Sequence, residues 1–488
     1  IFLPYLSVAD KSKFSEVQSF YQDDVIFITG ATGFLGKALL EKLLRSCPGI
    51  SRIYILIRPK KDASPTGRLE VLLKSEVRTL HCGCSGVCDV AKSYIYMGGF
   101  ISNRAGKKGR IFNFAEKHIC YGVVSKNAVA TNRKSVGFFV LDLQILKEAA
   151  AESSVFHIRR GSDAVVYVST AYVNCDHETL EERLYPSMVK PDDIITLTKT
   201  MDEVDLVKLT PELLGTKPNT YIFTKHLAES IVAEHGQRIP LVIVRPSIVS
   251  ASWREPVAGW LDGLQGVNLL VASAVTGVLT TIVADKSAVM DIIPIDVVAN
   301  ALIVAACQAP LRGRTLQVPS RQNLPVYNCT SGAINKISYG EVAVLTTKLG
   351  RKHTPATYFG RPGIDITMSP FYQAVAFFLF NYLPALLSDL IAIPCFDDFR
   401  FLMVDIQKKY QYFFFTTRFV TTHNWKFNSE KFIELHAHNT PLDRKIFNMD
   451  IRCINWEIYW EDYVKGMRRY LDKQQTTTSS DSPIQKGR

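Results

Sequence analysis

The chain has 488 residues, of which 47% are hydrophobic and 21% charged, and its formal net charge is +11. These values exclude a disordered chain and allow two or three domains with large cores. The positive charge suits an anionic partner such as a nucleotide, CoA or a phospholipid surface, whereas the absence of a basic helix or an aromatic-studded strand argues against nucleic acid. Ten cysteines without paired spacing favour a reduced, intracellular setting.

The first predicted element is a short buried strand at residues 25–28, followed by spaced glycines and an amphipathic helix over residues 34–44. In a dinucleotide-binding fold, such glycines allow a tight turn, a close approach to the pyrophosphate and close helix–strand packing. The amides at the start of the helix then face the diphosphate. An ordinary turn is the alternative, but the flanking strand and helix favour a nucleotide site. The predicted cofactor-binding residues here are Thr29, Gly30, Thr32, Gly33, Phe34, Leu35 and Gly36.

A second buried strand is predicted at residues 52–57, and it ends in the cations Arg58, Lys60 and Lys61. An acidic residue at this place binds the ribose 2′-hydroxyl, whereas an arginine accommodates a 2′-phosphate. Arg58 therefore predicts NADP rather than NAD, with a solvated basic loop as the alternative.

Residues 76–140 show neither a helical nor a strand period, and no function is assigned to them. Cys82, Cys84 and Cys88 lie close together there. A zinc site needs four ligands at structural spacing, and no second cluster follows, so no metal site is predicted.

The next buried strand begins at Ala164 and ends in the hydroxyls of Ser169 and Thr170, at the edge where ligands of open α/β sheets bind. Tyr221 and Lys225 follow, four residues apart and hence on one helix face. An ammonium group near a phenol lowers its pKa, which is about 10 when unperturbed. We therefore expect Tyr221 to exchange a proton near neutral pH, while Ser169 or Thr170 holds the substrate oxygen. Two residues on an exposed helix face are the alternative, which the order of the motifs disfavours.

These motifs, in this order, resemble the extended short-chain dehydrogenase/reductase superfamily. Their exact amino-acid sequences resemble those of the alcohol-forming fatty acyl-CoA reductases. The resemblance covers most of residues 16–75 and 164–472 and includes a male-sterility-type C-terminal domain. The segments that carry it are Phe27–Gly36, Leu56–Lys60, Tyr167–Tyr172, Tyr221–Lys225, Arg245–Val249, Trp253–Pro256, Gly259–Trp260, Asp291–Val297, Asn424–Phe427, Phe447–Arg452, Trp456 and Tyr463.

The resemblance implies an α/β protein with a Rossmann-like, doubly wound parallel sheet over residues 16–345. It also implies a mainly helical C-terminal domain over 362–472, after a linker at Gly350–Pro362; a disordered tail is expected over 473–488. The implied reaction is NADPH-dependent reduction of a long-chain fatty acyl-CoA to the primary alcohol, with release of CoA and an aldehyde-level intermediate. The implied location is intracellular and membrane-associated, at the endoplasmic reticulum or the peroxisome.

The resemblance also assigns roles to residues. Tyr221 would protonate the alkoxide, and Lys225 would lower its pKa and bind the nicotinamide ribose. Ser169 or Thr170 would orient the carbonyl, and Pro246 joins the cofactor-binding residues.

Residues 76–160 depart from this family. Val155–His157, taken as the strand before residue 164, runs almost directly into the next strand and leaves no room for the crossover that a parallel neighbour needs. Phe139–Leu143, with Asp142 as an adenine-contacting acid, is a weaker substitute for that strand. The departure keeps open a catalytically silent lipid- or nucleotide-binding relative. A sugar-nucleotide epimerase or dehydratase that shares Tyr221 and Lys225 is the other alternative.

Two uncharged stretches, residues 264–284 and 366–388, are long enough to be considered as membrane spans. Polar side chains interrupt the first, which is therefore predicted to be a buried core segment. The second, with its apolar continuation to residue 396, is predicted to associate with a membrane. It could do so as a span or as an interfacial helix, or it could bind the acyl chain.

Overall fold

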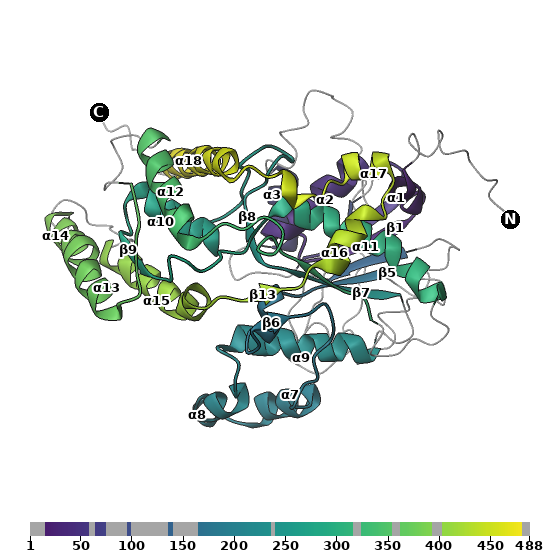
Figure 1. Cartoon of the computed structure of the whole chain (residues 1–488), viewed down its shortest axis with the longest axis horizontal. Helices are drawn as coiled ribbons and strands as arrows, with labels where there is room; N and C mark the ends of the chain where they lie inside the picture. The colour runs from purple at the N-terminus through teal and green to yellow at the C-terminus, as the bar shows by residue number, and fades with distance from the viewer. Residues whose placement is uncertain are drawn as a thin grey trace. The chain divides into compact units, whose positions relative to one another are not determined.

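The structure is a computed structural model, shown as a ribbon in Figure 1. It describes residues 15–57, 64–74, 95–98, 135–139, 164–235, 240–315, 324–353, 362–392 and 403–480.

The chain forms two compact units, each built from three pieces of sequence. Unit 1 comprises Ile1–Ser247, Ile295–Thr330 and Phe427–Asp450, and unit 2 comprises Ile248–Pro294, Ser331–Lys426 and Ile451–Arg488. The sequence instead predicts two domains that are each one continuous segment, residues 16–345 and 362–472, and this division remains a prediction.

Unit 1 is organised around a sheet of seven strands in the order β11-β7-β5-β4-β1-β2-β3, all paired in parallel. Because the strand order reverses between β1 and β4, the ligand site of such a sheet lies beyond the carboxyl ends of its central strands. This topology confirms the predicted doubly wound α/β fold. The strands are β1 (Val25–Thr29), β2 (Arg52–Leu56), β3 (Ile95–Gly98), β4 (Ser135–Phe139), β5 (Ala164–Val168), β7 (Leu241–Pro246) and β11 (Val326–Cys329).

Helices cover both faces of this sheet, and α2, α9 and α11 are the largest of them (Figure 1). Every residue of β5 and β7 is buried, as expected of strands in a parallel sheet with two covered faces. Val165 and Tyr167 of β5 pack with Ala228 and Val232 of α9. The helices of unit 1 are α1 (Glu16–Phe20), α2 (Phe34–Ser46), α3 (Pro65–Lys74), α7 (Pro191–Thr200), α8 (Glu203–Leu214), α9 (Thr220–His235), α11 (Ile295–Thr315), α16 (Glu430–Ala437) and α17 (Pro441–Ile446), with the 3₁₀ turn η2 (Ala171–Asn174).

The strand that precedes β5 differs from the sequence prediction. β4 (Ser135–Phe139) lies between β1 and β5, so residues 140–163 are available for the crossover, which is more than the dozen or so that a parallel connection needs. The expectation that the crossover is missing near His157 is therefore wrong. β3 and β4 also lie in a segment whose sequence shows no strand period. These short strands are specified by their pairing within the sheet and not by the local sequence pattern, which is why the sequence did not predict them. Residues 155–157 and Asp142 lie outside the described residues.

Unit 2 is mainly helical, with two parallel pairings of three-residue strands. Its elements are β8 (Ile248–Ser250), α10 (Val267–Thr276), β9 (Thr281–Val283), β10 (Ile292–Pro294), α12 (Tyr339–His353), β12 (Asp365–Thr367), α13 (Pro370–Phe377), the π-helical turn η5 (Phe378–Tyr382), α14 (Leu383–Ala392), α15 (Met403–Thr422), η7 (Ile451–Cys453) and α18 (Trp456–Ser480). The short strands β6 (Thr179–Leu180) and β13 (Lys426–Phe427) pair with each other.

The core of unit 2 forms around α18. Trp460 and Tyr463 are fully buried, and the Trp460 indole donates a hydrogen bond to Thr346 Oγ1 of α12 at 2.8 Å. A Cβ on Gly466 would lie 1.8 Å from Gly259 O, so glycine at this position lets the helix approach the Gly259 turn. Most of α10 is buried here, which confirms that residues 264–284 contain a core segment rather than a span.

The extent of two helices differs from the expected boundaries. α18 continues to Ser480, through residues 473–480 of the segment expected to be disordered, because helix propagates easily from the long, well-packed helix before it. α12 includes Gly350, which the sequence places at the start of a linker.

Candidate active site

The glycine turn after β1 leads directly into the first turn of α2. Gly30 has φ = +69°, a conformation that favours glycine, and Gly33 is the N-cap of α2 without a side-chain cap. A Cβ on Gly36 would lie 2.2 Å from Gly30 O, so only glycine allows the helix to approach the turn this closely. The first turn of α2 carries no acidic residue. This turn therefore fits the diphosphate of a dinucleotide, which the amides and the positive end of the helix dipole would bind.

Arg68 of α3 reaches the same turn, where its Nη2 donates a hydrogen bond to Thr32 Oγ1 at 2.9 Å. Sequence reasoning missed Arg68, because the contact depends on how α3 folds back beside the glycine turn. Arg58, the residue that it chose as the phosphate ligand, lies outside the described residues. Thr29, at the end of β1, is 1% exposed. Phe34 and Leu35 are half-buried in the first turn of α2.

The two hydroxyls after β5 have different surroundings. Thr170 Oγ1 accepts a hydrogen bond from Tyr172 N at 3.3 Å and thereby caps the η2 turn. Ser169 Oγ is buried and has no hydrogen-bond partner among the described residues, although the Ser169 amide donates to Val244 O on β7 at 2.8 Å. Pro246 ends β7 beside this strand. Ser169 is thus the hydroxyl available to a ligand.

Tyr221 and Lys225 lie in the first two turns of α9, whose start is fixed by Asn219: its Oδ1 accepts a hydrogen bond from Ile222 N at 2.9 Å. Lys225 Nζ donates to Val168 O at 3.2 Å, so the ammonium lies at the carboxyl end of β5, one residue before Ser169. Tyr221 keeps 57% of its area exposed.

The pKa of Tyr221 has the opposite direction from the one expected. Partial desolvation of the hydroxyl raises the Tyr221 pKa above its usual value, and no lowering by Lys225 accompanies it. The physical reason is that Lys225 Nζ is directed at Val168 O. The phenol therefore keeps its proton at neutral pH, which suits a proton donor rather than a base.

Three polar contacts within Lys225–Glu229 hold α9 against β5, η2 and β7. Besides Lys225 to Val168 O, His226 Nδ1 lies 2.9 Å from Asn174 Oδ1 of η2, and burial lowers the His226 pKa to about 4, so the ring is neutral. Glu229 binds Arg245 of β7 through two hydrogen bonds of 2.6 and 2.8 Å, and both side chains are almost fully buried. Arg245 also donates to the carbonyl oxygens of Glu181 and Arg183. Sequence reasoning noted Arg245 as part of a motif but missed its partner Glu229.

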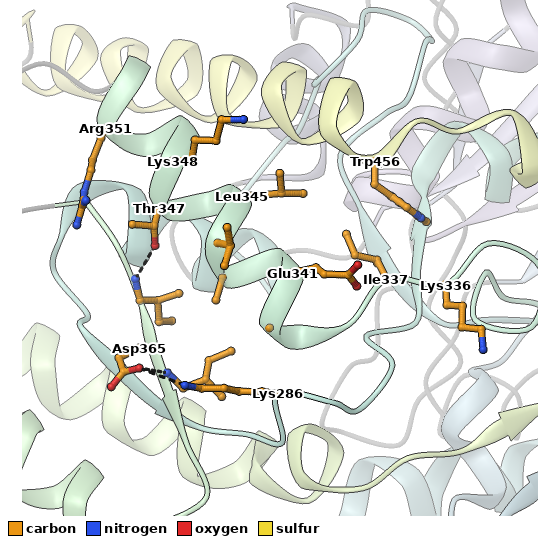
Figure 2. Close-up of a pocket in the computed structure, with 15 residues that line it drawn as sticks. Lys286, Lys336, Ile337, Glu341, Leu345, Thr347, Lys348, Arg351, Asp365 and Trp456 are labelled. Carbon is orange, nitrogen blue, oxygen red and sulfur yellow. Dashed lines mark hydrogen bonds and ion pairs between the residues drawn. The ribbon is translucent and has the colours of Figure 1, made fainter.

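Unit 2 has an open groove of its own, with a volume of about 1070 Å³ (Figure 2). Its lining combines the apolar residues Ile337, Leu345 and Trp456 with cations on several elements. Lys286 approaches Asp365 at 3.8 Å, and Lys348 pairs with Glu457 at 2.6 Å. None of the sequence-predicted site residues lies in this groove. Within the described part of the chain, no group of three or more His, Cys, Asp or Glu side chains is placed to hold a metal ion.

Comparisons with known proteins give the family of this chain. Two family models match the chain, both described as male sterility protein: the NAD-binding one at residues 28–83 and 151–302, and the C-terminal one at residues 380–474. Fatty acyl-CoA reductase 1 of Xenopus laevis is 32% identical over 93% of this chain and 86% of its own length. Fatty acyl-CoA reductase 1 of Homo sapiens is 31% identical over the same shares. The chain belongs to the fatty acyl-CoA reductase family.

This reductase also resembles solved structures in its fold. The terminal reductase domain of the myxalamid pathway superposes with a TM-score of 0.53 at 14% identity, covering 92% of this chain and 91% of that one. The reductase domain of a non-ribosomal peptide synthetase from Mycobacterium tuberculosis gives 0.51 at 15%, covering 96% of both chains. The match to the NAD-binding family model assigns a nicotinamide cofactor to this oxidoreductase. The family model leaves residues 84–150 unmatched, and both β3 and β4 lie in that stretch.

Proposed function

We propose that this chain reduces a long-chain fatty acyl-CoA to the primary alcohol, releases CoA and consumes two NADPH. The observation that supports this most is the set of groups at the end of β5. There α9 holds the Lys225 ammonium against Val168 O, and the buried Ser169 hydroxyl that follows has no protein partner among the described residues. A carbonyl oxygen can accept a hydrogen bond from that hydroxyl, and Tyr221, four residues before Lys225, can donate a proton.

The proposed reaction balances over two reductions. Bound NADPH would supply a hydride to the acyl carbon; the C–S bond would then break, the thiolate of CoA would take a proton and an aldehyde would remain. A second hydride reduces the aldehyde carbon, and Tyr221 gives its proton to the alkoxide oxygen. Because an alkoxide is far more basic than a phenolate, a phenol with a raised pKa can still make this transfer. Two NADPH and two protons are consumed for each alcohol and each free CoA.

The chain's own residues would hold the cofactor at three places. The amides of the glycine turn would bind the diphosphate, and Lys225 would bind the nicotinamide ribose, beside Pro246. Arg58 and Arg68 are the proposed ligands of the 2′-phosphate, which favours NADPH over NADH. Arg68 supports this choice because its guanidinium already lies at Thr32.

Association with a membrane, at the endoplasmic reticulum or the peroxisome, is the proposed setting. Pro370–Leu390 is, within the described part of the chain, the one helical stretch long and apolar enough to cross a membrane, and only 22% of its most apolar window is buried. A sugar-nucleotide epimerase would have no use for an exposed apolar stretch of this kind, and burial of the stretch as core would have favoured that alternative.

The test is turnover with acyl-CoAs of graded chain length and either NADPH or NADH, with the product identified as acid, aldehyde or alcohol. We expect alcohol, with NADPH preferred. Tyr221→Phe should lower kcat by at least about a hundredfold, the usual contribution of a positioned proton donor, while NADPH binding stays within about twofold.

Two results would contradict the proposal. Full turnover in the Tyr221→Phe variant would remove its role as the proton donor. Oxidation of neither cofactor by the wild type, with NADPH binding intact, would favour the catalytically silent relative instead.

A further inference from the structure

Helices α13 and α14, continuous through the η5 turn, carry a large apolar surface in unit 2. Residues 366–388 contain no charged side chain. Contiguous exposed apolar surface of this extent on a protein marks an interaction site. We call the following exposed side chains the apolar face: Met368, Phe371, Tyr372, Val375, Phe378, Leu379, Phe380, Leu386, Leu387 and Leu390, each 37–79% exposed.

The spacing of these side chains puts most of them on one side of the helix. Phe371, Val375 and Phe378 follow each other at intervals of three or four residues, and Leu386 and Leu390 continue that spacing in α14. Pro384 cannot donate a backbone hydrogen bond, and its ring crowds the carbonyl four residues earlier. The wider π-helical turn just before it accommodates the proline, so the helix continues to α14.

On the opposite side of the same helix, polar side chains form hydrogen bonds with the rest of unit 2. Asn381 is 3% exposed: its Nδ2 donates to Val278 O at 2.7 Å, and its Oδ1 accepts from Thr280 Oγ1 at 2.8 Å. Asp389 is 5% exposed and accepts hydrogen bonds from the amides of Met403 and Val404 at 2.8 and 2.9 Å. Asp389 thereby caps the start of α15.

These contacts are incompatible with a helix that crosses a bilayer. A span would need lipid on all sides of the helix, so the carboxylate of Asp389 and the amide of Asn381 would lose their protein partners and enter hydrocarbon. In contrast, a helix lying in the plane of the membrane buries only its apolar side in lipid. The structure already divides this helix into such a lipid-facing side and a protein-facing side.

We propose that the apolar face inserts into the surface of a phospholipid bilayer as an in-plane, monotopic helix. Lipid suits this surface because no charged side chain interrupts the face and because Phe371, Tyr372 and Phe378 are aromatic, as is common at headgroup depth. Tyr412 and Phe415 of α15, which packs against α14, are each 73% exposed and add to the aromatic surface. One argument rests on the proposed function: long-chain acyl substrates and fatty alcohols partition into membranes, which would bring both to this surface.

The experiment is flotation of the full chain with phosphatidylcholine vesicles, in the absence of nucleotide and acyl-CoA. The test variant is Phe371→Glu/Phe378→Glu/Leu387→Glu, which places three charges on the apolar face. The matched control is Val71→Glu/Val204→Glu/Val207→Glu, which replaces three apolar side chains of unit 1 that are 64–67% exposed. Circular dichroism and thermal unfolding verify that each variant is folded.

We expect the wild type and the control to float with the vesicles, and the test variant to partition at least about tenfold less. Alkaline carbonate should release the bound wild type, because an in-plane helix is not anchored across the bilayer. Equal flotation of the test variant and the wild type would overturn the proposal, as would resistance to carbonate, which indicates a span.

A second copy of the chain is the competing occupant of the apolar face. If the test variant changes from dimer to monomer in light scattering while vesicle binding is unchanged, the face is a dimer interface and the proposal is wrong. Since flotation is measured without cofactor or substrate, its outcome is independent of catalysis. An active enzyme that does not bind vesicles and a vesicle-bound chain without reductase activity are therefore distinguishable results.

Discussion

The hydroxyls of Ser169 and Thr170 are adjacent in sequence, and their surroundings separate their roles. Thr170 Oγ1 accepts the hydrogen bond that caps η2, whereas Ser169 Oγ is buried without a partner among the described residues. A buried hydroxyl without a partner carries a desolvation cost that a bound carbonyl would relieve. The sequence alone leaves the two residues equivalent, because both follow the same strand.

This difference predicts opposite effects of two similar substitutions. Ser169→Ala should lower kcat/KM for acyl-CoA by about 10²-fold or more while the free energy of unfolding changes little, since it removes a hydrogen bond to the developing oxyanion. Thr170→Ala should lower the free energy of unfolding by about 1 kcal/mol through the lost cap, with a smaller effect on kcat/KM. Steady-state kinetics and urea unfolding of both variants would measure this. A larger kinetic loss in Thr170→Ala than in Ser169→Ala would reverse the assignment.

At the scale of elements, α9 determines the geometry of the proposed site, because it carries Tyr221 and Lys225. Its position depends on groups that do not belong to the recognised motif. The pair of Glu229 and Arg245 joins α9 to β7 one turn after Lys225, in surroundings where both side chains are buried. Removing one partner of a buried ion pair leaves the other charge without compensation, and this costs more than the pair itself contributes.

We therefore expect Glu229→Gln, which preserves side-chain volume, to lower the free energy of unfolding by about 3–5 kcal/mol. The remaining folded enzyme should show a lower kcat with NADPH, because α9 is less firmly held. The matched control is Glu181→Ala, which breaks the exposed ion pair with Arg183 and should cost at most about 1 kcal/mol. Urea unfolding of both variants measures the difference. Equal stabilities of the two variants would contradict a positioning role for Glu229.

The elements that sequence could predict are those specified by local pattern. The apolar run at Val25, the three glycines and the helix after them define a strand–turn–helix unit without information from elsewhere in the chain, and the same holds for β5 and α9. Contacts that require tertiary structure were out of reach: Arg68 beside Thr32, Glu229 beside Arg245, and the direction of the Lys225 ammonium. That last contact explains why the expected lowering of the Tyr221 pKa was wrong.

At the scale of the whole molecule, the two units are interleaved in sequence. Unit 1 contains α1 and β1 near the start of the chain and is completed by Phe427–Asp450, which follows most of unit 2 in sequence. The returning segment is part of the core of unit 1: Phe432, Leu435 and Phe447 are at most 1% exposed. A sequence read from one end to the other suggests consecutive domains, because local patterns carry no information on which distant segments share a core.

Several polar contacts also join the returning segment to the rest of unit 1. Glu182 accepts hydrogen bonds from the amides of Lys431 and Phe432 at the start of α16, at 2.6 and 3.0 Å. Asn300 Nδ2 donates to Asn448 O at 2.8 Å, and Lys42 Nζ donates to Ile446 O at 2.6 Å. A chain that ends at residue 345 would lose all of these partners and expose the apolar surface beneath them.

We therefore expect a fragment comprising residues 16–345 to lack a cooperative unfolding transition and to aggregate, although it contains the whole parallel sheet and the predicted catalytic residues. Each lost buried aromatic side chain removes roughly 3 kcal/mol, a large fraction of the 5–15 kcal/mol that stabilises a typical domain. Co-expression with residues 346–488 should restore a soluble complex that binds NADPH, since it returns the segment 427–450 to unit 1. Near-ultraviolet circular dichroism and thermal unfolding of the fragment, alone and co-expressed, measure this. Cooperative unfolding of residues 16–345 alone, with NADPH binding equal to that of the full chain, would instead support two consecutive domains.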